Sequence, residues 1–189
     1  MPSNWSDVEK TTAGGLPTMP TQAIIIGTVL GIGAISCSGF YLSMMGGNVA
    51  LVPWMCVMLA VAVIFTYVVG FALLWCAESF TLRMRAKFKP LANGVVGLIG
   101  FGVWGLLVGT SLLNSIGQPL NGVVLSNGDV FAITLNYAVF GFLAFMLGQA
   151  FAPKLCTRKP LALALLAVQV VLAVFGVVAM VMMFSALYR

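Results

Sequence analysis

Long apolar runs alternate along this chain with short polar connections. The apolar runs cover residues 22–45, 51–78, 91–116, 129–152 and 160–187. Each exceeds the roughly 20 residues that a helix needs to cross the hydrocarbon core of a bilayer. Because the runs are continuous and do not alternate between apolar and polar positions, they do not fit the strands of a membrane β-barrel. The pattern therefore predicts an all-α polytopic membrane protein with five transmembrane helices.

Helix-breaking residues mark two of the connections between these runs. Gly46-Gly47-Asn48, with Pro53 close behind, separates the first two runs, and a segment from Gln118-Pro119 to Asn127-Gly128 separates the third from the fourth. Asp129 follows at a position where a helix N-cap is expected. We therefore predict that the chain leaves the third helix within this segment and that Asp129 caps the fourth.

Composition narrows the possible functions. Of the 189 residues, 61% are hydrophobic and 7% are charged, and the mean hydropathy is +1.11. A soluble domain carries about 25% charged residues, and a disordered chain combines low hydrophobicity with high charge, so both classes are excluded. The chain has no histidine, and its four cysteines show no CxxC spacing. Histidine is the usual haem ligand, the commonest metal ligand and the commonest general base, so we expect no cofactor and no metal site.

Positive charge is concentrated on one side of the predicted bundle. Eight of the nine Lys and Arg residues precede the first helix or follow the second and fourth helices, namely Lys10, Arg83, Arg85, Lys87, Lys89, Lys154, Arg158 and Lys159. The ninth, Arg189, ends the chain. The positive-inside rule then predicts a cytoplasmic N-terminus and a C-terminus on the opposite side of the membrane. Since the charge serves as a topology signal, nucleic acid is not expected among the partners.

Two segments of the chain resemble each other. GFALLWCAESF at 70–80 and GFLAFMLGQAF at 141–151 share three identical positions, and Glu78 falls opposite Gln149. A parallel duplication of a helical hairpin accounts for this, and the shared composition of Gly-rich spans is the alternative. The predicted organisation is a polar N-terminal segment at 1–21, a hairpin at 22–90, its repeat at 91–160 and a fifth helix at 161–189.

Glycines line one face of two predicted helices. Gly27 and Gly31 lie on one face of the first helix, and Gly102, Gly105 and Gly109 form a strip on the third. Small residues let helices approach closely in a bilayer, where lipid removes the hydrophobic drive for association. We predict that these glycines pack against other helices of the same chain, with a dimerisation face as the alternative.

Few polar side chains fall within the predicted spans. Counted at about 1.5 Å per residue, Tyr67, Trp104 and Gln169 lie near the bilayer centre. If they converge, they form a small neutral pocket; separate interhelical hydrogen bonds are the alternative. Nearer the outer face lies a second polar group, made up of Thr110, Ser111, Asn114 and Asn136.

Glu78 is the acidic candidate within the spans, at the inner end of the second helix. Its neighbours in the following connection are basic, so we predict an interfacial ion pair with Arg83 or Arg85. A coupling or proton-binding role is the alternative, and it requires the carboxylate to lie deep in the membrane.

The chain lacks the groupings that catalysis requires. It has no nucleophile–base pair, no phosphate-binding loop and no carboxylate pair, so we expect no catalytic residues. We expect a structural or accessory subunit of a larger membrane complex, in contact with the lipid bilayer and with other membrane subunits or further copies of itself. The alternative is a small transporter, channel or solute-binding membrane component for a neutral solute.

Overall fold

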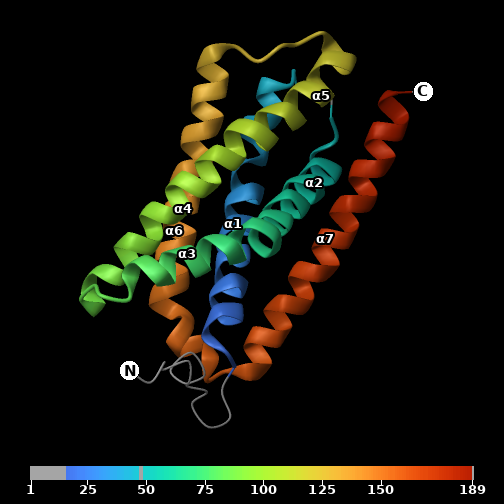
Figure 1. Ribbon diagram of the computed structural model, residues 1–189. Coiled ribbons are helices and arrows are strands. Elements are labelled where there is room, and N and C mark those ends of the chain that lie inside the picture. The colour runs from blue at the N-terminus through green and yellow to red at the C-terminus, as the bar shows by residue number, and fades with distance from the viewer. Residues whose placement is uncertain (1–15, 47–48, 189) are drawn as a thin grey trace.

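A computed structural model describes residues 16–46 and 49–188 as a bundle of long helices (Figure 1). Five helices in this part of the chain are long and apolar enough to cross a membrane, at Thr18–Met44, Leu51–Thr81, Ala86–Asn121, Asn127–Cys156 and Lys159–Leu187. The predicted all-α class with five spans is therefore confirmed. Residues 1–15 of the predicted N-terminal segment, which include Lys10, lie outside the described residues, as does Arg189.

Three spans are single helices, and two are interrupted by a π-helical turn. The uninterrupted spans are α1 (Thr18–Met44), α6 (Asn127–Cys156) and α7 (Lys159–Leu187). The second span consists of α2 (Leu51–Ile64), the π turn η2 (Phe65–Gly70) and α3 (Phe71–Thr81). The third consists of the 3₁₀ turn η3 (Ala86–Phe88), α4 (Lys89–Trp104), the π turn η4 (Gly105–Gly109) and α5 (Thr110–Asn121). A π turn departs from the regular spacing of a helix, and such turns are frequent at functional sites.

The third span continues two residues past Pro119, the proline at the start of the predicted connection. Pro119 lies inside α5, which ends at Asn121, and Gly122 closes it with a left-handed φ of +65°. Proline has no N–H to donate to the carbonyl four residues earlier, here that of Ser115. The Tyr188 hydroxyl donates to that carbonyl at 3.2 Å. The predicted connection between the third and fourth spans is present at 122–126, and α5 extends two residues past Pro119, where a side chain from the end of α7 supplies the missing donor.

The N-cap of the fourth span lies three residues before the predicted cap. Ser126 is the N-cap of α6, and its hydroxyl accepts a hydrogen bond from the Asp129 amide at 3.2 Å. The Asp129 carboxylate in turn accepts from the Ser126 amide at 3.0 Å and from its hydroxyl at 2.7 Å. Asp129 is therefore the third helical residue of a capping box and not the N-cap, because serine satisfies the free amides from one turn upstream.

Neighbouring helices in space are not always neighbours in sequence. α6 packs against α4 on one side and against α1 on the other, and α2 lies between α1 and α7. α3, at the end of the second span, packs against α4. The second span therefore begins beside α7 and ends beside α4, as its oblique course in Figure 1 shows.

Large aromatic side chains fill the centre of the bundle. Tyr41, Trp54, Phe65 and Phe145 are fully buried, and the Phe65 ring lies 4.5 Å from that of Phe101 on α4, centroid to centroid. Phe65 opens the π turn η2, so this turn directs an aromatic ring toward the third span. The repeat stays a prediction; the two π turns, at 65–70 and 105–109, do not fall at positions that the proposed duplication matches.

The two basic connections lie toward the same end of the bundle. Those between α3 and α4 and between α6 and α7 both lie in the lower half of Figure 1, together with the start of α1. The end of α7 lies at the opposite end. Which membrane face the basic end occupies stays a prediction from the positive-inside rule.

Candidate functional site

A cavity of about 500 Å³ lies at the basic end, between the start of α1 and the helices α3, α4 and α6. We call it the basic-end cavity. Its volume falls within the range of small-molecule sites, roughly 300–1,000 Å³. Part of its wall is apolar and is formed by Phe71, Leu74 and Leu82. The rest is polar or charged, so the cavity presents both kinds of surface to a ligand.

Five uncharged polar residues line this cavity, and three of them are more than nine-tenths buried. Gln22, near the start of α1, donates a hydrogen bond from Nε2 to Oε1 of Gln149 on α6. Asn93 donates from Nδ2 to the Lys89 carbonyl at 2.9 Å, one turn earlier in α4. The Thr81 hydroxyl donates to the Glu78 carbonyl at 3.3 Å. Gln22, Asn93 and Thr81 are 8%, 3% and 4% exposed, so the polar wall is held by the fold itself.

Two opposite charges also line the cavity. Glu78 comes from the last turn of α3, and Lys89 opens α4. Within the described part of the chain these two side chains form no salt bridge with each other. Among the described residues, the wall therefore includes one acidic and one basic residue that are not paired with each other, the exposed Glu78 and the half-buried Lys89.

The predicted ion pair of Glu78 with the arginines of the next connection does not form in the described part of the chain. Arg83 and Arg85 are exposed, and among the described residues neither forms a salt bridge with Glu78. α3 extends to Thr81, and the chain then turns into α4. Glu78 lines the basic-end cavity, whereas neither arginine is part of its wall.

Two of the three side chains predicted at the bilayer centre meet. The Tyr67 hydroxyl donates to Gln169 Oε1 at 2.7 Å. The Gln169 Nε2 donates to the Thr28 hydroxyl and to the Ile24 carbonyl, both at 2.7 Å. One glutamine thus links α7 to α1 and to the π turn of the second span. These hydrogen bonds involve both the oxygen and the nitrogen of the Gln169 amide.

Trp104 is not a hydrogen-bonding partner of this pair. Its ring lies 5.5 Å from that of Phe65, and its indole N–H has no hydrogen-bond partner among the described residues. A cavity of about 150 Å³ beside Gln169 is lined by side chains of α1, α2 and α7, and Trp104 is not one of them. The three side chains therefore do not form the single pocket that their depth suggested.

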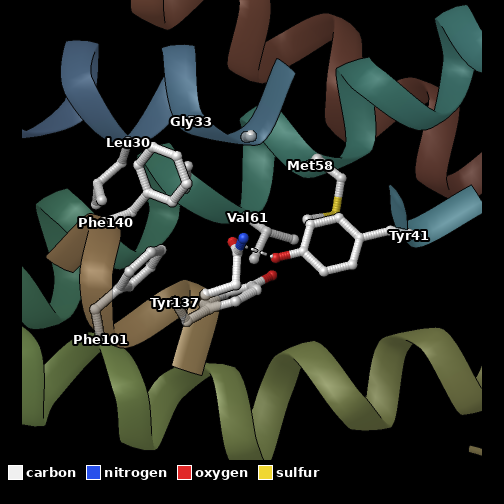
Figure 2. A pocket seen from close by; sticks show the side chains of 11 residues that line it. Leu30, Gly33, Tyr41, Met58, Val61, Phe101, Tyr137 and Phe140 are labelled. Atoms are coloured by element: carbon white, nitrogen blue, oxygen red, sulfur yellow. Dashed lines mark hydrogen bonds between the residues drawn. The ribbon is translucent and has the colours of Figure 1, made fainter. Parts of the chain in front are cut away.

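A second group of polar side chains in the interior lines a small cavity (Figure 2). The Tyr41 hydroxyl donates to Oδ1 of Asn136 at 2.9 Å, and Asn136 Nδ2 donates to Sγ of Cys37 at 3.4 Å. Figure 2 shows the hydroxyls of Tyr41 and Tyr137 turned toward one another at this cavity. Its volume is about 20 Å³. That is room for about one water molecule, which needs roughly 10–15 Å³.

The other members of the outer polar group do not converge with Asn136. The hydroxyls of Thr110 and Ser111 donate to carbonyls of their own helix, those of Leu106 and Leu107. Asn114 Oδ1 accepts from the Leu125 amide at 3.2 Å and so holds the connection to α6. These side chains satisfy local backbone and do not build a site.

The predicted packing glycines all face other helices. A methyl group on Gly27 would lie 2.8 Å from Gln169 Oε1, and one on Gly31 would lie 3.1 Å from Leu59. On the third span, a methyl on Gly102 would lie 3.2 Å from Ala138, and those on Gly105 and Gly109 would meet the Tyr137 ring at 2.5 and 3.1 Å. Both faces are used within this chain, α1 against α7 and α2, and the third span against α6.

Sequence reasoning missed most of the basic-end cavity. Gln22 and Asn93 fall at the ends of their apolar runs, where polar residues are unremarkable. The available signal was the alignment that placed Glu78 opposite Gln149, since both side chains line the cavity. Comparison of the chain with protein-family models, with curated proteins and with solved structures finds no match. A functional proposal therefore depends on the structure of this chain alone.

Proposed function

We propose that this chain is a non-catalytic structural or accessory subunit of a larger membrane complex, with α7 as its principal contact surface. The proposal rests on one observation: little of the surface of α7 is buried against the other helices of the chain. Only 17% of its most apolar stretch is buried within the chain, against 61% for the second span. α7 packs mainly along α2, where Gly176 lies directly against the Cys56 carbonyl.

An apolar groove at the outer end adds to this surface. It has a volume of about 510 Å³ and lies between the start of α2, the end of α5 and the end of α7. Met182 and Met183 form part of its wall, and Met182 is 66% exposed. Methionine side chains adapt to irregular surfaces, which suits contact with another helix. Met180 and Met183 also pack against the core of the chain itself, so Met182 is the exposed methionine of this group.

Site-specific photo-crosslinking in native membranes tests this proposal. A photoreactive residue in place of Met182 should give a discrete protein adduct, because this position faces the proposed partner. Leu135 on α6 is 52% exposed and provides the matched control, where lipid adducts alone are expected. Equal lipid labelling at both positions would contradict a partner at α7. An adduct of twice the mass of the chain would identify the partner as a second copy.

The alternative, a small transporter or solute-binding component, has one observation in its favour. The basic-end cavity is large enough for a small solute, whereas the cavity between Tyr41 and Tyr137 has room for about one water molecule. A solute that crossed the bundle would therefore require the helices to move apart. Uptake of neutral solutes by liposomes that contain the purified chain would favour this alternative.

A further inference from the structure

We propose that the basic-end cavity binds a zwitterionic ligand, one that carries an ammonium group and an anionic group on the same molecule. The inference does not rest on the accessory-subunit proposal, because it concerns the opposite end of the bundle from the groove beside Met182. It starts from the two residues of opposite charge in the cavity wall, Glu78 and Lys89, which form no salt bridge with another described residue.

Opposite charges in one cavity select against ligands of a single charge. A purely anionic ligand would be attracted by Lys89 and repelled by Glu78, and a purely cationic ligand would meet the reverse. A zwitterion pairs with both groups, and charge-assisted hydrogen bonds are the stronger kind. Discrimination of this type comes from repulsion of the wrong ligand as much as from attraction of the right one.

The amide side chains of the wall, of which Gln22 and Asn93 are buried, add matching hydrogen-bond groups. Asn93 uses its nitrogen to bond the Lys89 carbonyl, and its oxygen has no partner among the described residues. The Gln22–Gln149 pair likewise leaves the Gln22 oxygen and the Gln149 nitrogen without partners in the described chain. Two amide oxygens are therefore available to an ammonium group, and an amide nitrogen is available to an anionic group.

The remaining wall defines the uncharged part of the ligand. Phe71, Leu74 and Leu82 form an apolar surface beside the charged groups. Two sources supply this combination of ammonium, anion and apolar portion. One is the headgroup region of an amino-bearing phospholipid such as phosphatidylethanolamine, and the other is a free zwitterion with an apolar side chain, such as leucine.

Binding to the purified full-length chain in detergent tests the proposal. The probes are dihexanoyl-phosphatidylethanolamine, leucine and, as the single-charge control, dihexanoyl-phosphatidylglycerol, each titrated by calorimetry. We expect one of the two zwitterions to bind and the phosphatidylglycerol to bind at least tenfold more weakly. Preference for the phosphatidylethanolamine identifies a lipid site, and preference for leucine identifies a solute site.

Variants of the two charges decide whether the binding occurs in this cavity. Glu78→Gln and Lys89→Gln should each weaken the binding of the preferred zwitterion at least tenfold. Arg83→Gln and Lys87→Gln remove exposed charges from the same connection that do not line the cavity, and affinity should stay within twofold. The proposal is overturned if neither zwitterion binds, if phosphatidylglycerol binds as tightly, or if Glu78→Gln and Lys89→Gln bind as well as the controls.

Discussion

The closest approach between α4 and α6 can be tested by adding one methyl group. At Gly141 that methyl would lie 2.6 Å from Cβ of Phe101 and 3.0 Å from the carbonyl carbon of Gly97. Carbon atoms in ordinary contact lie about 3.5–4.0 Å apart, so the two helices would have to separate by about 1 Å. The obstacle includes backbone, which cannot rotate away as a side chain can. We expect Gly141→Ala to cost about 1–3 kcal/mol through overpacking.

Gly39→Ala provides the matched control. Gly39 lies in α1, and a methyl there would meet nothing within 4 Å. Alanine favours a helix over glycine by up to about 1 kcal/mol, and this gain applies to both variants. The difference between them therefore measures the packing term. Reversible unfolding in mixed micelles, followed by circular dichroism as the SDS fraction rises, supplies the two free energies. If both variants unfold at the same SDS fraction, α4 and α6 do not meet through Gly97 and Gly141.

Three further experiments address other parts of the structure. In a double-mutant cycle, Tyr67→Phe and Gln169→Leu should show a coupling energy near the average of about 0.6 kcal/mol for hydrogen bonds within membranes, and additive effects would rule out the contact. Ser126→Ala should lower the free energy of unfolding by about 0.5–2 kcal/mol because it removes the cap of α6. Ser36→Ala removes an exposed hydroxyl from α1 and should change the free energy of unfolding little. Equal effects of the two variants would argue against the capping box. In a cysteine-free background, Ser126→Cys should react with a membrane-impermeant maleimide in intact cells and Thr157→Cys only after permeabilisation, and the reverse pattern would refute the predicted orientation.

Hydropathy predicted the spans well because the bilayer imposes their length. A helix shorter than the hydrocarbon core would expose unsatisfied backbone groups to lipid, so the five apolar runs had to become five helices. The ends of the helices were less predictable. Pro119 lies within α5 because Tyr188, more than sixty residues later, bonds to the carbonyl that the proline leaves free. No local pattern could indicate that contact.

Depth in the membrane predicted one contact of the central site and missed the other. Tyr67 and Gln169 lie at similar depth and bond to each other. Trp104 was placed at the same depth by counting residues, yet its ring packs on Phe65. Counting residues gives the height of a side chain along its helix, but the direction in which it points depends on the rotation of that helix. The π turns at 65–70 and 105–109 alter that rotation, and the apolar runs give no sign of them.

The polar partners of α1 have a consequence for the synthesis of the chain. Gln22, Thr28 and Tyr41 bond to side chains of the fourth and fifth spans, namely Gln149, Gln169 and Asn136. The first span leaves the ribosome more than ninety residues before the earliest of these partners. Throughout that interval α1 can pack against α2, but its three polar side chains lack the partners that they have in the finished bundle. The bundle can therefore close around α1 only late in translation, and until then the first span depends on the insertion machinery, or on water at the membrane surface, to satisfy those groups.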